Sequence, residues 1–258
     1  MLVSRKFFLN RKKMIGFLDE LETATTTSLY IPIGLSLPEV DKVLEQKAIS
    51  PELTEMVAGS KTGSVIFWNP SHIYLVTPPF PIMETHFAKG CAIEPLRSML
   101  KRDYRIALIL VRLGAYAIGL YQGEILINSK VGTGLVHSRH KKGGSSQKRF
   151  QRHREKQIES FLNRVCSHTR EIFEPQKRIL DYLVYGGAKT TILSLQKHCS
   201  FLRQFEDYNL PPLLDIAEPR QVVLETAVGR VWLSSVTEWR DDRIYTGNTT
   251  EQFKTYLK

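Results

Sequence analysis

The sequence predicts a mixed α/β protein in which strand patterns and amphipathic helices alternate along the chain. The first observation is a run of three strand-like segments between residues 104 and 130, joined by Leu-Gly and Gln-Gly pairs that favour tight turns. The second is the order of the patterns that follow: helix, strand, helix, strand and helix. Together they predict a mixed sheet with helices on both faces. The third is composition, because 258 residues with 42% hydrophobic and 24% charged side chains can bury a sizeable core.

The first part of the chain predicts an α/β region. Residues 11–22 place Met14, Phe17, Leu18 and Leu21 at helical spacing. The other predicted helices have a proline near their start, and they cover residues 37–46, 51–59 and 93–102. The predicted strands are rich in β-branched and aromatic residues, and they cover residues 27–35 and the two arms of an Asn-Pro turn between 63 and 81. Pro32 indicates that the first of these strands lies near an edge or an end of its sheet.

The second part of the chain carries the strongest strand signal. Three antiparallel strands are expected at residues 104–111, 115–121 and 124–130. The elements expected after them are a long helix at 146–170, a buried strand at 179–187, a helix at 190–202, a strand at 211–218 and a final helix at 219–239. We therefore expect a first domain over residues 1–102, a second domain over 103–240 and a polar tail over 241–258.

Cysteine content and hydropathy indicate a soluble cytoplasmic protein. Cys91, Cys166 and Cys199 are odd in number, lie far apart and form no C-x-x-C pair, so we expect three free thiols. The N-terminus lacks the unbroken apolar stretch of a signal peptide. The apolar run from Ile106 to Val111 is too short to cross a bilayer. No membrane partner is expected, and we expect a monomer.

The net charge of +10 is concentrated in one stretch, His137–Lys156, here named the basic segment. It contains eight Lys or Arg and one Glu, and a Gly-Gly-Ser-Ser tip that is followed by Gln147. On a helical wheel, Phe150 falls on the apolar side with Ile158, Phe161, Leu162 and Val165. Lys148, Arg149, Arg152 and Lys156 fall on the opposite side. Clustered cations beside a helix N-terminus favour contact with phosphates, so the segment predicts a nucleic-acid partner.

Other chemistries fit the residues less well. The glycines of the basic segment are not followed by the Lys-Ser/Thr of a P-loop. Its histidines lack nearby Cys or Asp, so we expect no metal site and no cofactor. Ser145 and Ser146 lack a local acid to orient a histidine. A two-metal nuclease would need converging carboxylates, and Glu124, Asp181 and Asp215 are more often turn or cap residues at such positions.

The stretch "ALILVRLGAYAIGLYQGEILINSK…KKGGSSQKRFQRHREKQIESFLNRV" resembles the middle domain of eukaryotic and archaeal class-I peptide-chain release factors. The resemblance extends upstream through "TTTSLYIPIG", "KTGSVIFWNP" and "TPPFPIMETHFAKGCAIEPLRSML" to their first domain, and it covers about Thr25 to Trp239. Those factors have a Gly-Gly-Gln tip, whereas this chain has Gly-Gly-Ser-Ser-Gln. That tip is more similar to the Vms-like release factors, ribosome-rescue relatives that include a bacterial branch. The stop-codon element Asn-Ile-Lys-Ser is absent, and the GTPase-recruiting third domain has no counterpart in the resemblance.

The resemblance implies a release-factor-like first region, an RNase H-like second domain and peptidyl-tRNA release without codon reading. It implies a catalytic tip formed by Gly143, Gly144 and Gln147, acting on peptidyl-tRNA held by the rRNA of the large ribosomal subunit. The expected RNA-binding residues are Arg139, His140, Lys141, Lys142, Lys148, Arg149, Arg152 and Lys156. Two alternatives stay open: an endonuclease that cuts the tRNA 3′ end, and a ribosome- or RNA-binding factor without catalysis.

Overall fold

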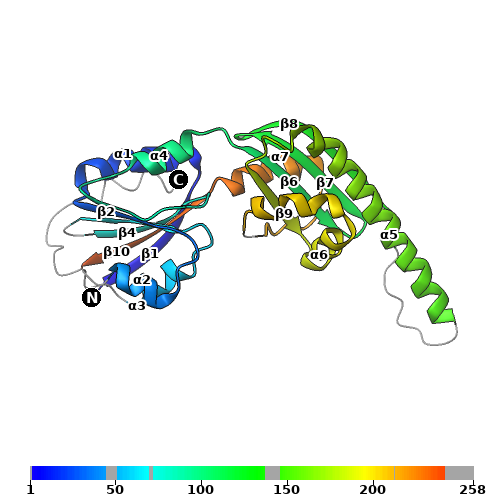
Figure 1. The fold of residues 1–258 in the computed structure, drawn as a ribbon, viewed down its shortest axis with the longest axis horizontal. Helices are drawn as coiled ribbons and strands as arrows, with labels where there is room; N and C mark the ends of the chain where they lie inside the picture. The colour runs from blue at the N-terminus through cyan, green and yellow to red at the C-terminus, as the bar shows by residue number, and fades with distance from the viewer. Residues whose placement is uncertain (1, 45–50, 70–71, 137–145, 212, 242–258) are drawn as a thin grey trace. The chain divides into compact units, whose positions relative to one another are not determined.

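The structure, a computed structural model, describes residues 2–44, 51–69, 72–136, 146–211 and 213–241 (Figure 1). The chain divides into two compact units. The first unit contains the residues up to Arg102 together with the chain from Trp232 onward, and the second unit spans Asp103–Val231. Within the described residues, no helix is both long and apolar enough to cross a membrane.

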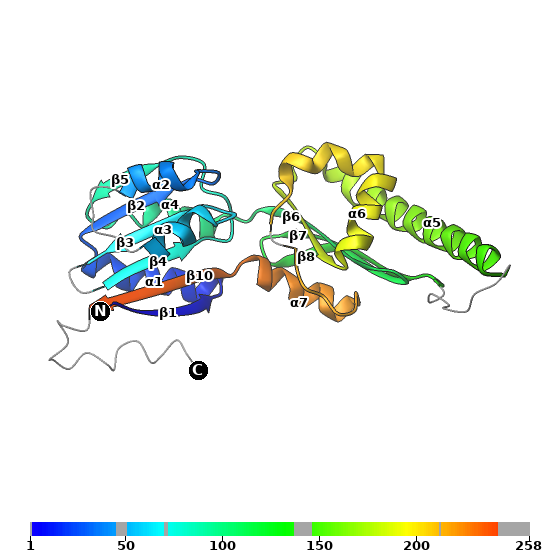
Figure 2. The same cartoon turned by 90° about the horizontal axis from the view of Figure 1, so that it is seen from below.

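The first unit is built on a six-stranded antiparallel sheet in the order β1–β10–β4–β3–β2–β5 (Figure 2). Its strands are β1 (Leu2–Leu9), β2 (Thr27–Ile31), β3 (Ser64–Trp68), β4 (His72–Thr77), β5 (His86–Lys89) and β10 (Ser234–Asp241). Its helices are α1 (Arg11–Ala24), α2 (Leu37–Leu44), α3 (Pro51–Ala58) and α4 (Glu94–Lys101). The helices predicted in this part of the chain are all present. The first predicted strand stops at Ile31, directly before Pro32, and lies next to the edge strand β5.

Helices cover both faces of this sheet. Val76 of β4 packs in one core cluster with Phe17 of α1 and Leu96 of α4. The neighbouring Leu75 packs in a second cluster with α2 and α3. Because successive side chains of a strand point to opposite faces, the two clusters lie on opposite sides of the sheet.

Three strands of this sheet, β1, β5 and β10, lie where the sequence patterns do not predict a strand. The sequence predicts one helix over residues 219–239, but helix α7 (Gln221–Val231) ends early and Ser234–Asp241 forms β10. Strand β10 lies between β1 and β4, and it buries Val236 on one face and Trp239 on the other. A strand buried on both faces shows no alternation of apolar and polar residues, so the sequence pattern here does not distinguish a strand from the end of a helix. Residues 232–240 therefore belong to the first unit, and their assignment to the second domain is wrong.

The second unit has the predicted mixed sheet, in the order β8–β7–β6–β9. Its strands are β6 (Arg105–Arg112), β7 (Ala115–Gln122), β8 (Ile125–Thr133) and β9 (Tyr182–Gly187). Strands β6, β7 and β8 form an antiparallel meander, and β9 pairs in parallel with β6. Its helical segments are α5 (Ser146–Phe173), η1 (Glu174–Gln176), α6 (Lys189–His198), η2 (Ser200–Tyr208) and α7.

Helices lie on both faces of this second sheet, as predicted. Ile118 of β7 packs in a core cluster with residues of α5 and α6. On the opposite face, the Tyr121 hydroxyl donates a hydrogen bond of 2.6 Å to the Leu224 carbonyl of α7. A Cβ at Gly119 would lie 3.1 Å from Leu224 Cδ1, so glycine lets α7 approach the sheet closely. The mixed α/β fold class is therefore confirmed for both units.

The strand predicted at 211–218 is wrong. The described residues of that segment contribute one isolated bridge, from Leu214 to Gly186 of β9, and no strand. Leu214 and Ile216 are buried because they cover Gly186, where an added Cβ would lie 3.0–3.1 Å from their side chains. Packing of an irregular segment onto the sheet thus explains the apolar pattern.

Candidate functional site

Helix α5 continues well past the sheet that supports its C-terminal half (Figures 1 and 2). From Phe161 onward, one side of the helix is buried in the core of the second unit. The sheet ends beside Phe161, because a Cβ on Gly134, just after β8, would lie 2.8 Å from the Phe161 ring. Residues Ser146–Ser160 are here named the helix extension. At 1.5 Å per residue this extension is roughly 20 Å long.

The side chains described in the helix extension are not buried. Residues Lys148–Arg152 are all exposed, and Ile158 packs only partly against the core. Phe150 is 60% exposed, so its predicted place in the core is wrong. The apolar side of α5 is longer than the sheet it packs on. The sequence period gives the side of the helix but not the point at which the sheet ends.

The exposed side chains make the extension cationic. Lys148, Arg149, Arg152 and Lys156 are exposed, and Arg154 is half-buried. The acids in this stretch are Glu155 and Glu159, and Glu155 accepts a 2.9 Å hydrogen bond from the Gln151 amide. Positive charge therefore lies on exposed side chains of a helix segment that the sheet does not cover.

The structure locates only part of the predicted catalytic tip. Gln147 is the second residue of α5, and its side chain lies outside the described part of the chain. Gly143 and Gly144 lie outside the described residues, as do Arg139, His140, Lys141 and Lys142. The fold thus brings Lys148, Arg149, Arg152 and Lys156 together on the helix that begins next to Gln147. For the other predicted residues, the site stays a prediction.

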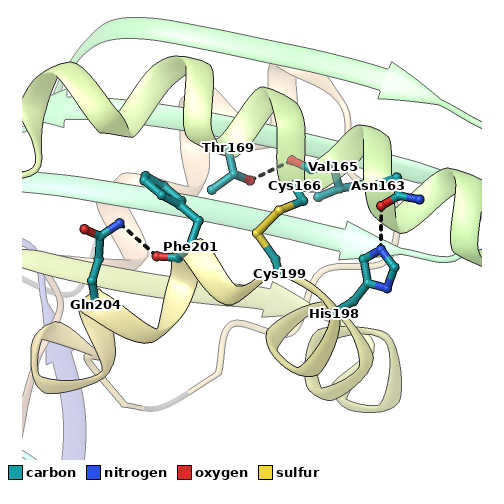
Figure 3. The surroundings of a disulfide bond; sticks show 8 residues. All are labelled: Asn163, Val165, Cys166, Thr169, His198, Cys199, Phe201 and Gln204. Carbon is teal, nitrogen blue, oxygen red and sulfur yellow. Dashed lines mark hydrogen bonds between the residues drawn. A yellow bond between two sulfur atoms is a disulfide. The ribbon is translucent and has the colours of Figure 1, made fainter.

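Hydrogen bonds hold the part of α5 that leaves the sheet, here named its base, against other elements of the second unit. The Arg164 guanidinium donates a 2.8 Å hydrogen bond to the Thr133 carbonyl at the end of β8. The Asn163 amide oxygen accepts a 2.6 Å hydrogen bond from Nε2 of His198 in α6 (Figure 3). These contacts hold α5 where it leaves the sheet, so that the extension starts from a fixed base.

A disulfide joins Cys166 of α5 to Cys199, directly after α6 (Figure 3). The prediction of three free thiols is therefore wrong, and Cys91 is the free cysteine. The two bonded residues are 33 positions apart. Their spacing carries no motif from which the pairing could have been read.

A contact between the buried Tyr116 of β7 and the half-buried His168 lies further along the same helix. The Tyr116 hydroxyl lies 2.5 Å from Nδ1 of His168. Burial, followed by the charge of Lys130, lowers the pKa of His168, so the neutral imidazole is favoured. Gly132 makes room for this pair, because a Cβ there would collide with the tyrosine hydroxyl. The pair packs α5 against β7 and β8, and no sequence motif marks it.

Two of the three acids named for a two-metal site, Asp181 and Asp215, have other contacts. The Asp181 carboxylate accepts a 2.8 Å hydrogen bond from the backbone of Arg105. Asp215 lies 3.8 Å from the Arg112 guanidinium. Within the described ranges, no three His, Cys, Asp or Glu side chains gather as a metal site requires. A two-metal nuclease site thus has no support from these residues.

Known proteins resemble this chain over most of its length. Its similarity to peptide chain release factor subunit 1 of Aeropyrum pernix is 24% identity over 296 aligned residues, covering 99% of this chain and 77% of that protein. The same factor from Archaeoglobus fulgidus is 29% identical over 113 residues. That alignment covers 44% of this chain and 28% of the Archaeoglobus protein. Among solved structures, the archaeal translation termination factor aRF1 is similar with a TM-score of 0.39 and 17% identity, over 87% of this chain and 73% of that one.

A family profile gives the assignment. Residues 104–237, more than half of the chain, match the profile described as the Actinobacteria/chloroflexi VLRF1 release factor. The match covers the meander, α5 and the elements that follow, which carry the resemblance inferred from the sequence. The chain therefore belongs to the Actinobacteria/chloroflexi VLRF1 release factor family.

Proposed function

We propose that the protein is a ribosome-associated peptidyl-tRNA hydrolase that frees stalled nascent chains from tRNA on the large subunit. The observation that carries the proposal is the cationic helix extension, roughly 20 Å long, which begins next to Gln147 and is held at its base by the second unit. A rod of this length can carry a reactive tip into a narrow RNA-lined space while the folded domain stays outside. Membership of a release factor family supports peptidyl-tRNA as the substrate.

The extension suits RNA because its charge can replace the counterions around phosphates. Lys148, Arg149, Arg152 and Lys156 are exposed and lie within three turns of the helix. Each phosphate that a cation neutralises releases condensed counterions, which favours binding and makes it salt-dependent. In this proposal, these residues and Arg139, His140, Lys141 and Lys142 hold rRNA and the acceptor end of tRNA.

The proposed chemistry is attack of water on the ester that joins the peptide to the tRNA. A bond forms between the water oxygen and the carbonyl carbon, the ester bond breaks, and a proton moves to the departing 3′ oxygen of the tRNA. A neutral amide such as Gln147 is not a base at neutral pH, but it can both donate and accept a hydrogen bond. Its role is therefore to orient the water, and proximity supplies the rate enhancement. Gly143 and Gly144 lack a Cβ and let the backbone approach the RNA closely.

Release in this proposal is independent of stop codons. The sequence lacks the Asn-Ile-Lys-Ser element by which related factors read those codons. The substrate we propose is a separated large subunit that still carries peptidyl-tRNA, where no small subunit and no codon take part. The protein acts there as a single chain.

Product analysis on purified large subunits carrying labelled peptidyl-tRNA tests the proposal. Free peptide together with tRNA that keeps an intact 3′ end is the expected result. A shortened tRNA would indicate endonuclease cleavage of the tRNA instead of ester hydrolysis. Binding without any product would indicate a ribosome-binding factor without catalysis. Intact ribosomes paused at stop or sense codons provide the comparison. A strong preference for stop-codon complexes would contradict release without codon reading.

A further inference from the structure

We infer that Phe150 is a nucleobase-stacking residue, whose ring packs against an unpaired RNA base while the neighbouring cations hold the phosphates. The inference rests on the proposed function for its partner, the RNA of the large subunit or of the tRNA. It adds an aromatic contact to a site otherwise described by charge alone.

The exposure of Phe150 is the observation that carries the inference. Phe150 is 60% exposed, whereas Phe161, on the same helix, is 2% exposed in the core. Water-exposed aromatic surface is unfavourable, and a sheet that ends at Phe161 cannot cover it. A flat apolar ring on a helix that stands away from its own domain is suited to contact with another molecule.

The surroundings of Phe150 select RNA over an apolar protein surface. Lys148, Arg149 and Arg152 are exposed within two residues of the ring along the chain. Burial of these charges against an apolar partner would be costly, because each would lose its water without gaining an anion. A single-stranded RNA offers phosphates for the cations and a base face for the ring. Aromatic rings among cations are the usual platform for such strands.

The helical register places the ring close to the proposed catalytic position. Gln147 precedes Phe150 by three residues of α5, a separation of about 4.5 Å along the helix axis. A base stacked on Phe150 would therefore fix the strand one helical turn from Gln147 and limit how far the tip can slide.

Binding measurements across a series of salt concentrations test this inference separately from catalysis. The probes are tRNA-free large subunits and deacylated tRNA alone, which distinguish an rRNA base from a tRNA base. Phe150→Ala should weaken binding to one of them by roughly 5- to 150-fold at every salt concentration, without changing the salt slope. Phe150→Trp should restore the affinity and Phe150→Leu should not, because leucine has no aromatic face.

Two control variants separate stacking from charge and from general surface effects. Arg152→Ala should reduce the log–log salt slope by about 1 and thus behave differently from Phe150→Ala. Leu193→Ala changes an exposed apolar residue of α6 and should leave both affinity and slope unchanged.

Several outcomes would overturn the inference. Wild-type affinity of Phe150→Ala for both probes would remove the stacking contact, and wild-type affinity of Phe150→Leu would indicate apolar burial against a ribosomal protein instead. A fall in melting temperature that accounts for the lost affinity would make Phe150 structural. Because these measurements use no peptide, they can succeed even if peptide release fails, and the reverse also holds.

Discussion

Two phenylalanines of helix α5 should differ sharply in their contribution to stability, although they lie only three turns apart. Phe161 is 2% exposed, and its ring makes an edge-on contact with Tyr116 at a centroid distance of 5.9 Å. Phe161→Ala should therefore cost about 3–5 kcal/mol of unfolding free energy, from lost burial and from the cavity left behind. Phe150 is 60% exposed, so Phe150→Ala should cost less than about 1 kcal/mol.

Urea unfolding of the two variants, followed by two signals, measures this difference. Far-UV circular dichroism reports strongly on the long helix α5. Tryptophan fluorescence reports on the first unit, because Trp68, Trp232 and Trp239 all lie there. Phe161→Ala should lower the midpoint of the dichroism transition and leave the fluorescence transition nearly unchanged. If Phe150→Ala cost as much as Phe161→Ala, the helix extension would be packed in solution, and the argument from its exposure would fail.

Three further predictions concern the base of α5 and its charge. Reduction of the Cys166–Cys199 disulfide, which closes a loop of 33 residues, should cost about 4 kcal/mol of unfolding free energy in the chain-entropy estimate. Cys166→Ser should be insensitive to reductant, and equal stability of the wild type with and without reductant would contradict the bond. The lowered pKa of His168 implies stability that is present above the unfolded value of about 6.5 and is lost as pH falls through the folded pKa. An NMR titration that placed this pKa above 6.5 would contradict the burial beside Tyr116. Arg152→Ala should weaken binding to large subunits most at low salt, and equal weakening at every salt concentration would exclude a phosphate contact.

Much of the fold could be predicted because its signals are local. The meander from β6 to β8 and the long helix α5 each show a hydrophobic period within one segment, and both are present in the structure. The parallel pairing of β9 with β6 follows from the intervening helix, since parallel strands need a long crossover.

The parts that could not be predicted depend on distant pairing. Strands β1 and β10 pair along their full length, although they come from opposite ends of the described chain. Neither strand has a clear alternation of its own, because β10 is buried on both faces and β1 carries Arg5 and Lys6 at the sheet edge. The disulfide likewise joins cysteines whose proximity only the packing of α5 on α6 creates.

Some features of the candidate site can likewise be predicted from the sequence, and others cannot. The concentration of charge in the basic segment and the position of Gln147 at the start of a helix are readable from sequence. The exposure of Phe150 is not, because an amphipathic pattern does not say how far the supporting sheet extends. The length of a sheet is set by all its strands together, so the pattern of one helix could not reveal that α5 continues beyond it.

Single-turnover peptide release by Gln147→Ala, on purified large subunits carrying peptidyl-tRNA, directly tests whether Gln147 takes part in catalysis. The matched control is Gln151→Ala, which removes an exposed glutamine one turn further along α5, where the amide contacts Glu155. If Gln147 orients the attacking water, its variant should release peptide at least about 100-fold more slowly while binding large subunits normally. Gln151→Ala should release peptide at the wild-type rate. Wild-type release by Gln147→Ala would contradict the proposed role of the tip, and with it the proposed mechanism of this protein.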